Sequence, residues 1–343
     1  MGQQEILFTR QSGFGPLADI VERDGGCDAV LALFGESVED LRAKSPLAPV
    51  PFSKMVATYG HAAELLDDPL IGVRVGLGFE IEAFGPWAVY LLAAPTLGAA
   101  MDRMQFGERL QSNAIRSRVV RAGARVRLEL SYRSGHGVSA FQHMLRLQVM
   151  QIALLRRFQP DLSSAAEILL TDGDARYARR VSDMLGLPVR AGAMHSGIEF
   201  PAAWLKCGAA VAPAAVTNPI DGAYRDAPLP GSVADAVRAV IRGYAEPFEC
   251  GMANLDAVAT LLNVSRRWTQ AALQREGVSF RDMLRDARIA HARGLLADTD
   301  ETLAAVAQLA GYADQSHFHR AFVAVTGVTP HRFRVAARAA AAE

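Results

Sequence analysis

The chain has 343 residues, of which 50% are apolar and 21% are charged. This composition excludes a disordered charged tail and a low-complexity chain, and the length favours about two domains. Lys and Arg together number 36, as do Asp and Glu, so the overall charge points to no particular class of partner.

The first 210 residues predict a mixed α+β domain. Apolar residues at helical spacing predict helices over Ser53–Leu66 and Val138–Phe158, and Asp174–Leu185 reads as a helix stopped by glycine and proline. Alternating apolar and polar residues predict a strand over Arg125–Arg133, and Ala166–Thr171 is a second candidate. Strands this few and scattered do not fit a doubly wound parallel sheet.

A proline-rich segment separates this domain from the rest of the chain. Residues 211–231 include prolines at 213, 219, 228 and 230 and few large apolar side chains, which is typical of a linker. We therefore expect a first domain over residues 1–210, a linker over 211–231, a second domain over 232–338 and a tail over 339–343.

The second domain predicts short helices and no strand. The expected elements, in chain order, are helices over Val233–Tyr244, Leu255–Leu262, Arg266–Glu276, Phe280–Leu296, Leu303–Ala310 and Gln315–Val325, with a short turn at Pro330–Arg334. Capping chemistry precedes several starts: Ser265, Ser279 with Asp282, and Asp300.

An internal repeat organises these helices. The pattern L-x-A-V-A-x-L occurs at Leu255–Leu261 and again at Leu303–Leu309. In each copy a residue able to take a positive φ follows two positions after the last leucine, Asn263 in one and Gly311 in the other. An apolar residue and another short helix come next.

The repeat has the residue types that a helix-turn-helix unit needs. Ala259 and Ala307 are small where a second helix would cross close to the first, and Val264 and Tyr312 would fill the corner between helices. One copy alone fits any αα-corner. Two copies joined by a helix of about 17 residues, roughly 25 Å long, could place two helices about one DNA turn apart.

The second domain resembles the DNA-binding domain of AraC/XylS-type bacterial transcription regulators. Seven residues between Gly311 and Arg334 carry the strongest match: Gly311, Phe318, Arg320, Phe322, Gly327, Pro330 and Arg334. The first half matches at Ser265, Arg267, Leu273, Gly277, Phe280, Leu284, Arg288, Ala292, Leu295 and Leu296. The resemblance covers about 233–338 without a gap.

This resemblance implies that the second helix of each repeat contacts bases of double-stranded DNA. The residues at those positions are Arg266, Arg267 and Gln270 in the first repeat, and Gln315, Ser316, His319 and Arg320 in the second. Arginine can bind guanine, and glutamine adenine, with two hydrogen bonds each. For each arginine a phosphate contact or a solvated helix face is the alternative. Thr269, Ala271 and Val323 depart from the family's usual residues.

The first domain is similar to the arabinose-binding-type N-terminal domain of one branch of these regulators. The match over about 20–206 rests on Pro95–Gly98, Gly186–Val189, Phe200-Pro201 and Trp204-Leu205. It implies a domain that senses a small-molecule effector, which the sequence does not identify, and that forms a homodimer. RNA polymerase is a candidate further partner.

Two other classes of function are the alternatives: an enzyme fused to a DNA-binding module, and a metal- or haem-sensing regulator. A DNA-repair methyl-acceptor enzyme fused to a DNA-binding module needs an activated thiol, but Cys27 lies beside an aspartate and Cys207 has only Lys206 nearby. A metal- or haem-sensing regulator needs clustered ligands, whereas the histidines are scattered and His143 is expected to be a hydrogen-bonded core residue. The sequence therefore predicts no cofactor, no metal and no catalytic residues. With neither a signal peptide nor a membrane span apparent, it predicts a cytoplasmic protein.

Overall fold

The computed structural model describes residues 6–26, 37–133, 140–163, 165–209, 224, 228–243 and 254–341. It divides into two compact units, one containing Leu7–Leu229 and the other Pro230–Glu343. Most of the expected linker lies outside the described residues, as do Cys27, Cys250 and the start of the helix expected at Val138. The two units are considered separately below.

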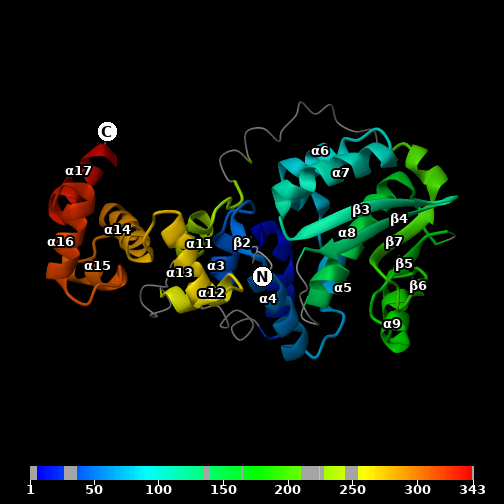
Figure 1. The fold of residues 1–343 in the computed structure, drawn as a ribbon, viewed down its shortest axis with the longest axis horizontal. Helices are drawn as coiled ribbons and strands as arrows, with labels where there is room; N and C mark the ends of the chain where they lie inside the picture. The colour runs from blue at the N-terminus through cyan, green and yellow to red at the C-terminus, as the bar shows by residue number, and fades with distance from the viewer. Residues whose placement is uncertain are drawn as a thin grey trace. The chain divides into compact units, whose positions relative to one another are not determined.

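The first unit combines helices with two sheets (Figure 1). Its elements in chain order are β1 (Phe8–Arg10), η1 (Gln11–Phe14), α1 (Leu17–Arg23), α3 (Val38–Ala43), β2 (Pro49–Pro51), α4 (Phe52–Leu65), α5 (Ile71–Leu77), η2 (Ile81–Phe84), α6 (Pro86–Leu92), α7 (Leu97–Gln111), β3 (Ile115–Ala122), β4 (Arg125–Tyr132), α8 (Phe141–Phe158), β5 (Glu167–Leu169), α9 (Ala175–Leu185), β6 (Val189–Arg190), β7 (Ser196–Pro201) and η4 (Ala202–Lys206). This confirms the α+β class expected for the first domain.

The larger sheet has the strand order β3-β4-β7-β5-β6. All its pairs are antiparallel except β5 with β6, so it is not a doubly wound parallel sheet. Strand β4 forms where alternation predicted it, with Val126, Leu128 and Leu130 buried. Strand β5 is shorter than expected, and β3, β6 and β7 were not predicted. Beside the sheet, β1 and β2 form a separate antiparallel pair.

Helix α8 is the central element of this unit, because it packs against α4, α5 and β7. Glycines allow α5 to cross it closely. A Cβ atom at Gly72 would lie 2.0 Å from the carbonyl oxygen of Gln142, and one at Gly76 would lie 2.6 Å from Cβ of Val149. The glycines of α5, which spell no phosphate-binding motif, therefore serve helix packing.

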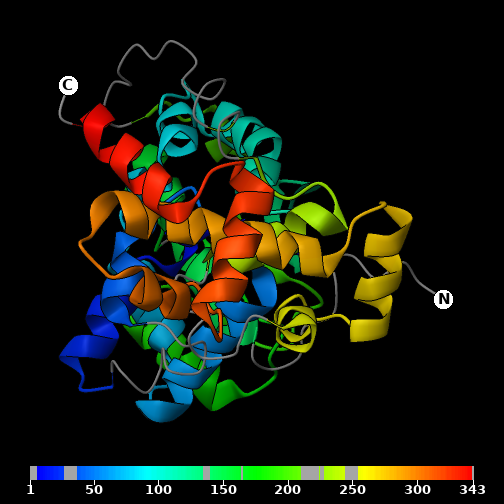
Figure 2. The same cartoon turned by 90° about the vertical axis from the view of Figure 1, so that its left-hand side faces the viewer.

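The second unit is helical throughout its described residues. It contains α11 (Val233–Gly243), α12 (Leu255–Leu261), α13 (Arg266–Arg275), α14 (Phe280–Asp298), α15 (Leu303–Leu309), α16 (Gln315–Thr326) and α17 (Pro330–Ala341). Helix α14 lies between α12 and α13 of the first repeat and α15 and α16 of the second (Figures 1 and 2). At 19 residues, α14 is about 28 Å long at 1.5 Å per residue.

Both turns have the geometry that the repeat predicted. Asn263 has φ of 55° and Gly311 has φ of 77°. The small residues Ala259 and Ala307 are 2% and 1% exposed, which confirms close helix crossings. After each turn a backbone N–H reaches back to the alanine carbonyl, from Val264 at 3.0 Å in the first repeat. The second repeat has the same bond, from Tyr312 to Ala307, at 2.9 Å.

The C-terminal end differs from the expectation. Pro330 begins a 12-residue helix, α17, rather than a short turn. Proline suits the first position of a helix, where its missing N–H leaves no bond unmade, and alanines follow it. Arg334 and Arg338 attach α17 to the preceding part of the unit, donating to the backbone oxygens of Glu301 at 2.6 Å and Thr299 at 2.5 Å.

Two of the predicted caps are wrong. Thr302, not Asp300, caps α15, accepting the backbone N–H of Ala305 at 3.1 Å. The Asp300 carboxylate instead accepts a hydrogen bond from Arg338 at 2.7 Å. Ser279 precedes α14 but makes no side-chain capping bond. Its expected partner, Asp282, forms an ion pair with Arg285 at 2.7 Å.

Candidate functional site

Helix α13 presents three predicted site residues to solvent. Arg266, Arg267 and Gln270 are all exposed. The Ser265 side chain caps the helix, accepting the N–H of Trp268 at 3.2 Å, and this fixes where α13 begins. Thr269 points into the unit, where it is fully buried and donates to the Ser265 carbonyl oxygen at 3.1 Å. The departure from the family at Thr269 therefore concerns the core of the unit.

Arg266 differs from its neighbour in having a partner. Its guanidinium forms an ion pair with Asp256 of α12 at 2.6 Å, and both side chains are about three-fifths exposed. An exposed pair of this kind contributes little to stability, about 0–1 kcal/mol, so Arg266 can leave it at small cost. Arg267 has no such partner among the described residues.

Helix α16 presents the other four. Gln315, Ser316, His319 and Arg320 are exposed, and Ser316, His319 and Arg320 share one face of the helix by their spacing. Asp314 caps the helix, accepting the N–H of His317 at 2.6 Å. The opposite face carries Phe318 and Phe322, both fully buried. The buried face is therefore fixed and the polar face stays open.

Several arginines of this unit interact with other residues of the unit, so fewer positive charges remain available to bind a nucleic acid. Arg285 pairs with Asp282 and Asp286, and the Arg288 guanidinium lies over the ring of Tyr312 at 5.6 Å. By contrast, Arg267 and Arg320 are exposed and make no ion pair or hydrogen bond with any described residue. The sequence alone does not show which arginines of the unit are already engaged.

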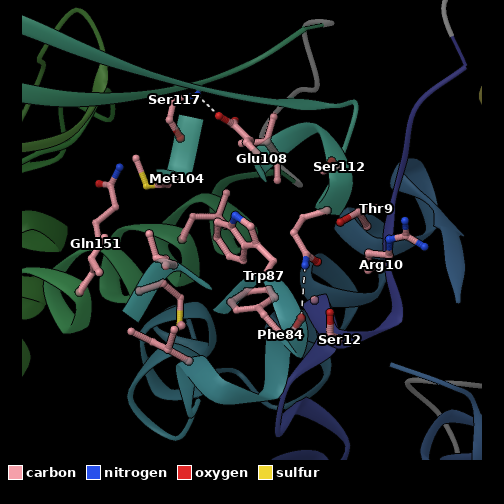
Figure 3. Close-up of a pocket in the computed structure, with 18 of the residues that line it drawn as sticks. Thr9, Arg10, Ser12, Phe84, Trp87, Met104, Glu108, Ser112, Ser117 and Gln151 are labelled. Carbon is pink, nitrogen blue, oxygen red and sulfur yellow. Dashed lines mark hydrogen bonds between the residues drawn. The ribbon is translucent and has the colours of Figure 1, made fainter. Parts of the chain in front are cut away.

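The first unit contains a cavity that the sequence did not reveal. Its volume is about 90 Å³, and its walls are mainly apolar side chains from α6, α7 and α8. Figure 3 shows Trp87 at the centre of the cavity wall, with Glu108 and Arg10 on different sides of it. The cavity also includes Arg146 and Gln151 of α8. An apolar cavity with a few polar groups is typical of a small-molecule site.

Arg146 is the most unusual of these groups. It is 1% exposed, and its Nε and Nη1 atoms have no hydrogen-bond partner among the described residues. Its guanidinium lies 5.4 Å from the ring centroid of Phe79 and 5.6 Å from that of Phe84. Burial lowers the pKa of Arg146, since removing the charge from water disfavours it. The positive charge has no carboxylate opposite it among the described residues.

Glu108 of α7 is the acid of the cavity. Its Oε2 accepts the backbone N–H of Ser117 at 2.9 Å, while Oε1 is buried without a partner in the described part of the chain. Burial raises the pKa of Glu108 to about 7, against lowering effects from the Ser117 hydrogen bonds and the Arg116 charge. The group therefore changes charge near neutral pH.

One residue of the expected linker is held in the same unit. Tyr224 is 5% exposed, and its hydroxyl is 2.5 Å from Nε2 of Gln111. The hydroxyl donates to the Phe84 carbonyl oxygen at 3.3 Å, and the Arg10 guanidinium lies 5.2 Å from the centre of the ring. Gln111, Phe84 and Arg10 also line the cavity, so Tyr224 is attached to the cavity wall.

The residues weighed for other chemistry occupy ordinary environments. His143 is fully buried, and its Nδ1 lies 3.0 Å from the Tyr132 hydroxyl, which confirms the expected core histidine. The Cys207 sulfur, half-buried, lies 3.9 Å from the side-chain oxygen of Gln159. Within the described ranges, no group of three or more His, Cys, Asp or Glu could hold a metal ion. No described helix is long and apolar enough to cross a membrane.

Two family models match the chain. The arabinose-binding domain of AraC transcription regulators matches residues 26–208, and a helix-turn-helix domain matches residues 258–336. Both matches fall where the sequence suggested these resemblances, and neither describes the methyl-acceptor enzyme that was weighed against them. No curated protein sequence matches the chain.

Solved structures of transcription regulators are similar to parts of the chain. The regulator CdpR from Pseudomonas aeruginosa is 21% identical, with a TM-score of 0.35, over 78% of this chain and 86% of that one. A DNA-binding dual regulator from Escherichia coli is 23% identical, with a TM-score of 0.29, over 32% of this chain and 95% of the other. The C-terminal domain of AraT from Geobacillus stearothermophilus is 28% identical, with a TM-score of 0.26, over 30% and 84% respectively.

The arabinose-binding-type model alone spans more than half of the chain, and the helix-turn-helix model covers the two repeats that follow it. The protein therefore belongs to the AraC family of transcription regulators, with an effector-binding N-terminal domain and a helix-turn-helix DNA-binding domain.

Proposed function

We propose that α13 and α16 read base edges in two successive major-groove segments of one DNA site. The residues proposed to do so are Arg266, Arg267, Gln270, Gln315, Ser316, His319 and Arg320. One observation carries this proposal: each of the two matching turns presents an exposed arginine, Arg267 or Arg320, that is not engaged by any described residue.

The chemistry of these side chains suits sequence reading. Arginine can bind O6 and N7 of guanine with two hydrogen bonds, and Gln270 or Gln315 can bind N6 and N7 of adenine in the same way. Arg266 would exchange its exposed pair with Asp256 for a DNA group, at a cost of about 0–1 kcal/mol. We expect a strong salt dependence, because basic side chains displace counterions from the phosphates.

The effector-dependent part of the proposal concerns the whole chain. Residues 1–210 would sense the effector and form the homodimer, 211–231 would link, 232–338 would bind DNA, and 339–343 would be a tail. An effector controls DNA binding only by binding more tightly to one arrangement of the protein than to another. We further propose that the protein acts in a bacterial cytoplasm and that RNA polymerase is a partner.

Selection of binding sites from random DNA with the purified full-length protein tests the proposal. The wild-type chain should enrich one motif with two conserved segments about one helical turn apart. Arg267→Ala should weaken selection of one segment, and Arg320→Ala that of the other. Arg285→Ala removes an arginine that is already ion-paired within α14 and should leave the motif unchanged. Failure of the wild-type protein to enrich any sequence at moderate salt would contradict the proposal.

A further inference from the structure

The cavity of the N-terminal unit contains a buried positive charge that no lining residue among those described balances with an ion pair. Apolar side chains such as Trp87, Met104 and Leu154 provide most of the lining. Among the polar residues of the lining, Arg146 stands apart, because its charge is almost completely removed from solvent and its Nε and Nη1 atoms have no hydrogen-bond partner among the described residues. A buried charge without a partner is costly, and proteins rarely keep one that has no use.

The surroundings of Arg146 supply no anion. No carboxylate among the described residues forms an ion pair with it, and the groups that raise its pKa against the effect of burial are the hydroxyls of Tyr59 and Tyr132. Those hydroxyls are directed elsewhere, since Tyr59 donates to the Gly13 carbonyl oxygen at 3.1 Å and Tyr132 to that of Ala140 at 3.2 Å. The guanidinium Nε and Nη1 atoms therefore remain buried donors without a hydrogen-bond partner among the described residues.

The other arginine of the cavity is in a different state. Arg10 donates from Nε to the Leu110 carbonyl oxygen at 2.8 Å and from Nη1 to that of Leu47 at 2.5 Å. It also faces the ring of Tyr224. Arg10 is thus a structural group that joins segments of the unit, and Arg146 is the group with unused donors.

We propose that this cavity binds a small carboxylate with an apolar body, and that the Arg146 guanidinium holds the carboxylate. This inference rests on the proposed function, because it names the chemical class of the effector. A carboxylate carries one negative charge and two oxygens, which match one guanidinium in charge and in spacing. The apolar walls would surround the hydrocarbon part. Because a cavity of about 150 Å³ holds benzene, a volume of about 90 Å³ favours roughly three to five carbon atoms in that part.

Phosphate esters and amino acids fit less well. A phosphate would bring close to two negative charges into a cavity where Arg10 is already engaged, leaving one guanidinium to balance them. An amino acid adds an ammonium group, for which Glu108 is the only carboxylate among the described residues that line the cavity. Because burial raises the pKa of Glu108 to about 7, this carboxyl is largely neutral below neutral pH and a weak partner for a cation.

Calorimetric titration and thermal unfolding of the full-length protein test the inference. The ligands are butanoate, 3-methylbutanoate and hexanoate, together with the primary amide of each and the amino acids valine and leucine. At least one carboxylate should bind and raise the melting temperature, since a ligand of the native state stabilises it. Its amide should bind at least about tenfold more weakly, because a charge-assisted bond is lost. Amide binding as tight as that of the acid, or tighter binding of the amino acids, overturns the inference.

The matched variants are Arg146→Met and Arg156→Met, both on α8. Arg156 is exposed and does not line the cavity, so its variant should bind the carboxylate like the wild-type chain. Arg146→Met should bind at least about tenfold more weakly. It should also fold at least as stably without ligand, because it removes a buried charge that has no partner in the described part of the chain. Unchanged carboxylate binding by Arg146→Met overturns the inference, and so does the absence of binding of any carboxylate to the wild-type protein.

DNA binding distinguishes this inference from the proposed function. Arg146→Met without ligand should select the same DNA motif as the wild-type protein, because Arg146 lies in the other unit. If the wild-type protein selects a motif but binds no carboxylate, only the ligand class is wrong. If it binds a carboxylate but selects no motif, the DNA-reading proposal fails and the ligand assignment stands.

Discussion

Replacing Arg320 by alanine gives the most direct test of the proposal that α16 reads bases. Arg320 is exposed, and it forms no ion pair or hydrogen bond with any described residue. Its removal should therefore change the free energy of unfolding by no more than about 0.5 kcal/mol. If its guanidinium binds a guanine with two bonds, affinity for the selected site should fall by about 1–3 kcal/mol, or roughly 5- to 150-fold.

Fluorescence anisotropy with the selected site and with single-base variants of it provides the assay. The Arg320→Ala protein should lose discrimination at one base pair and keep it elsewhere. Arg320→Lys keeps the charge without the two-pronged geometry, so it should recover salt-dependent affinity but little of the discrimination. Arg281→Ala, which removes one exposed charge from α14, serves as the control. Equal weakening on all sequences, with a smaller salt slope, would make Arg320 a phosphate contact and refute the base-reading argument.

Three further results are expected. Ala307→Leu should lower the free energy of unfolding of the second unit by about 1–3 kcal/mol in urea denaturation, because α16 with its buried Phe318 leaves no room; an unchanged midpoint would contradict the close crossing. Because the pKa of Glu108 is raised to about 7, the native state holds a proton that the unfolded chain loses at lower pH. The free energy of unfolding of the first unit should then fall as the pH rises from 5 to 7, by at most about 1.4 kcal/mol for each pH unit. In the Glu108→Gln variant this free energy should depend less on pH. Tyr224→Phe removes a hydroxyl that lies 2.5 Å from Gln111 and should cost about 1 kcal/mol of first-unit stability in the same assay, whereas no cost would mean that this bond is unimportant.

The helix-turn-helix repeats could be predicted from sequence because their constraints are local. A positive φ at Asn263 or Gly311 requires particular residue types, and a close crossing requires a small residue such as Ala307. Both signals lie within a few positions of each other and occur twice. The exposed faces of α13 and α16 follow once the buried faces are assigned. Predicted caps failed where the acidic residue had another partner: Arg338 engages Asp300, and Arg285 engages Asp282.

The cavity of the first unit could not be predicted because its groups come from distant parts of the chain. Arg10, Glu108 and Arg146 lie on separate elements, and only the tertiary fold brings them to one cavity. Strand β7 pairs with β4, although α8 and further elements separate the two strands in the sequence. No short sequence pattern therefore identifies this pairing. The one local signal was Arg146 itself, a charged residue within the apolar helix α8, where its neighbours Leu145 and Val149 are buried. A charged residue within a predicted core helix indicates a buried charge, which needs a partner.

We propose that ligand binding acts on the DNA-binding unit through Tyr224, a residue of the expected linker. Gln111 and Arg10 both line the cavity and both contact Tyr224, so a ligand that moves either residue changes how firmly Tyr224 is held. Such coupling is reciprocal, because one free energy relates the two binding events. If the carboxylate strengthens DNA binding by some factor, the DNA must strengthen carboxylate binding by the same factor. Tyr224→Phe removes the hydroxyl that Gln111 contacts but keeps the ring that Arg10 faces. Weakening of both effects by the same factor in this variant, with each separate affinity retained, is the result that this route requires.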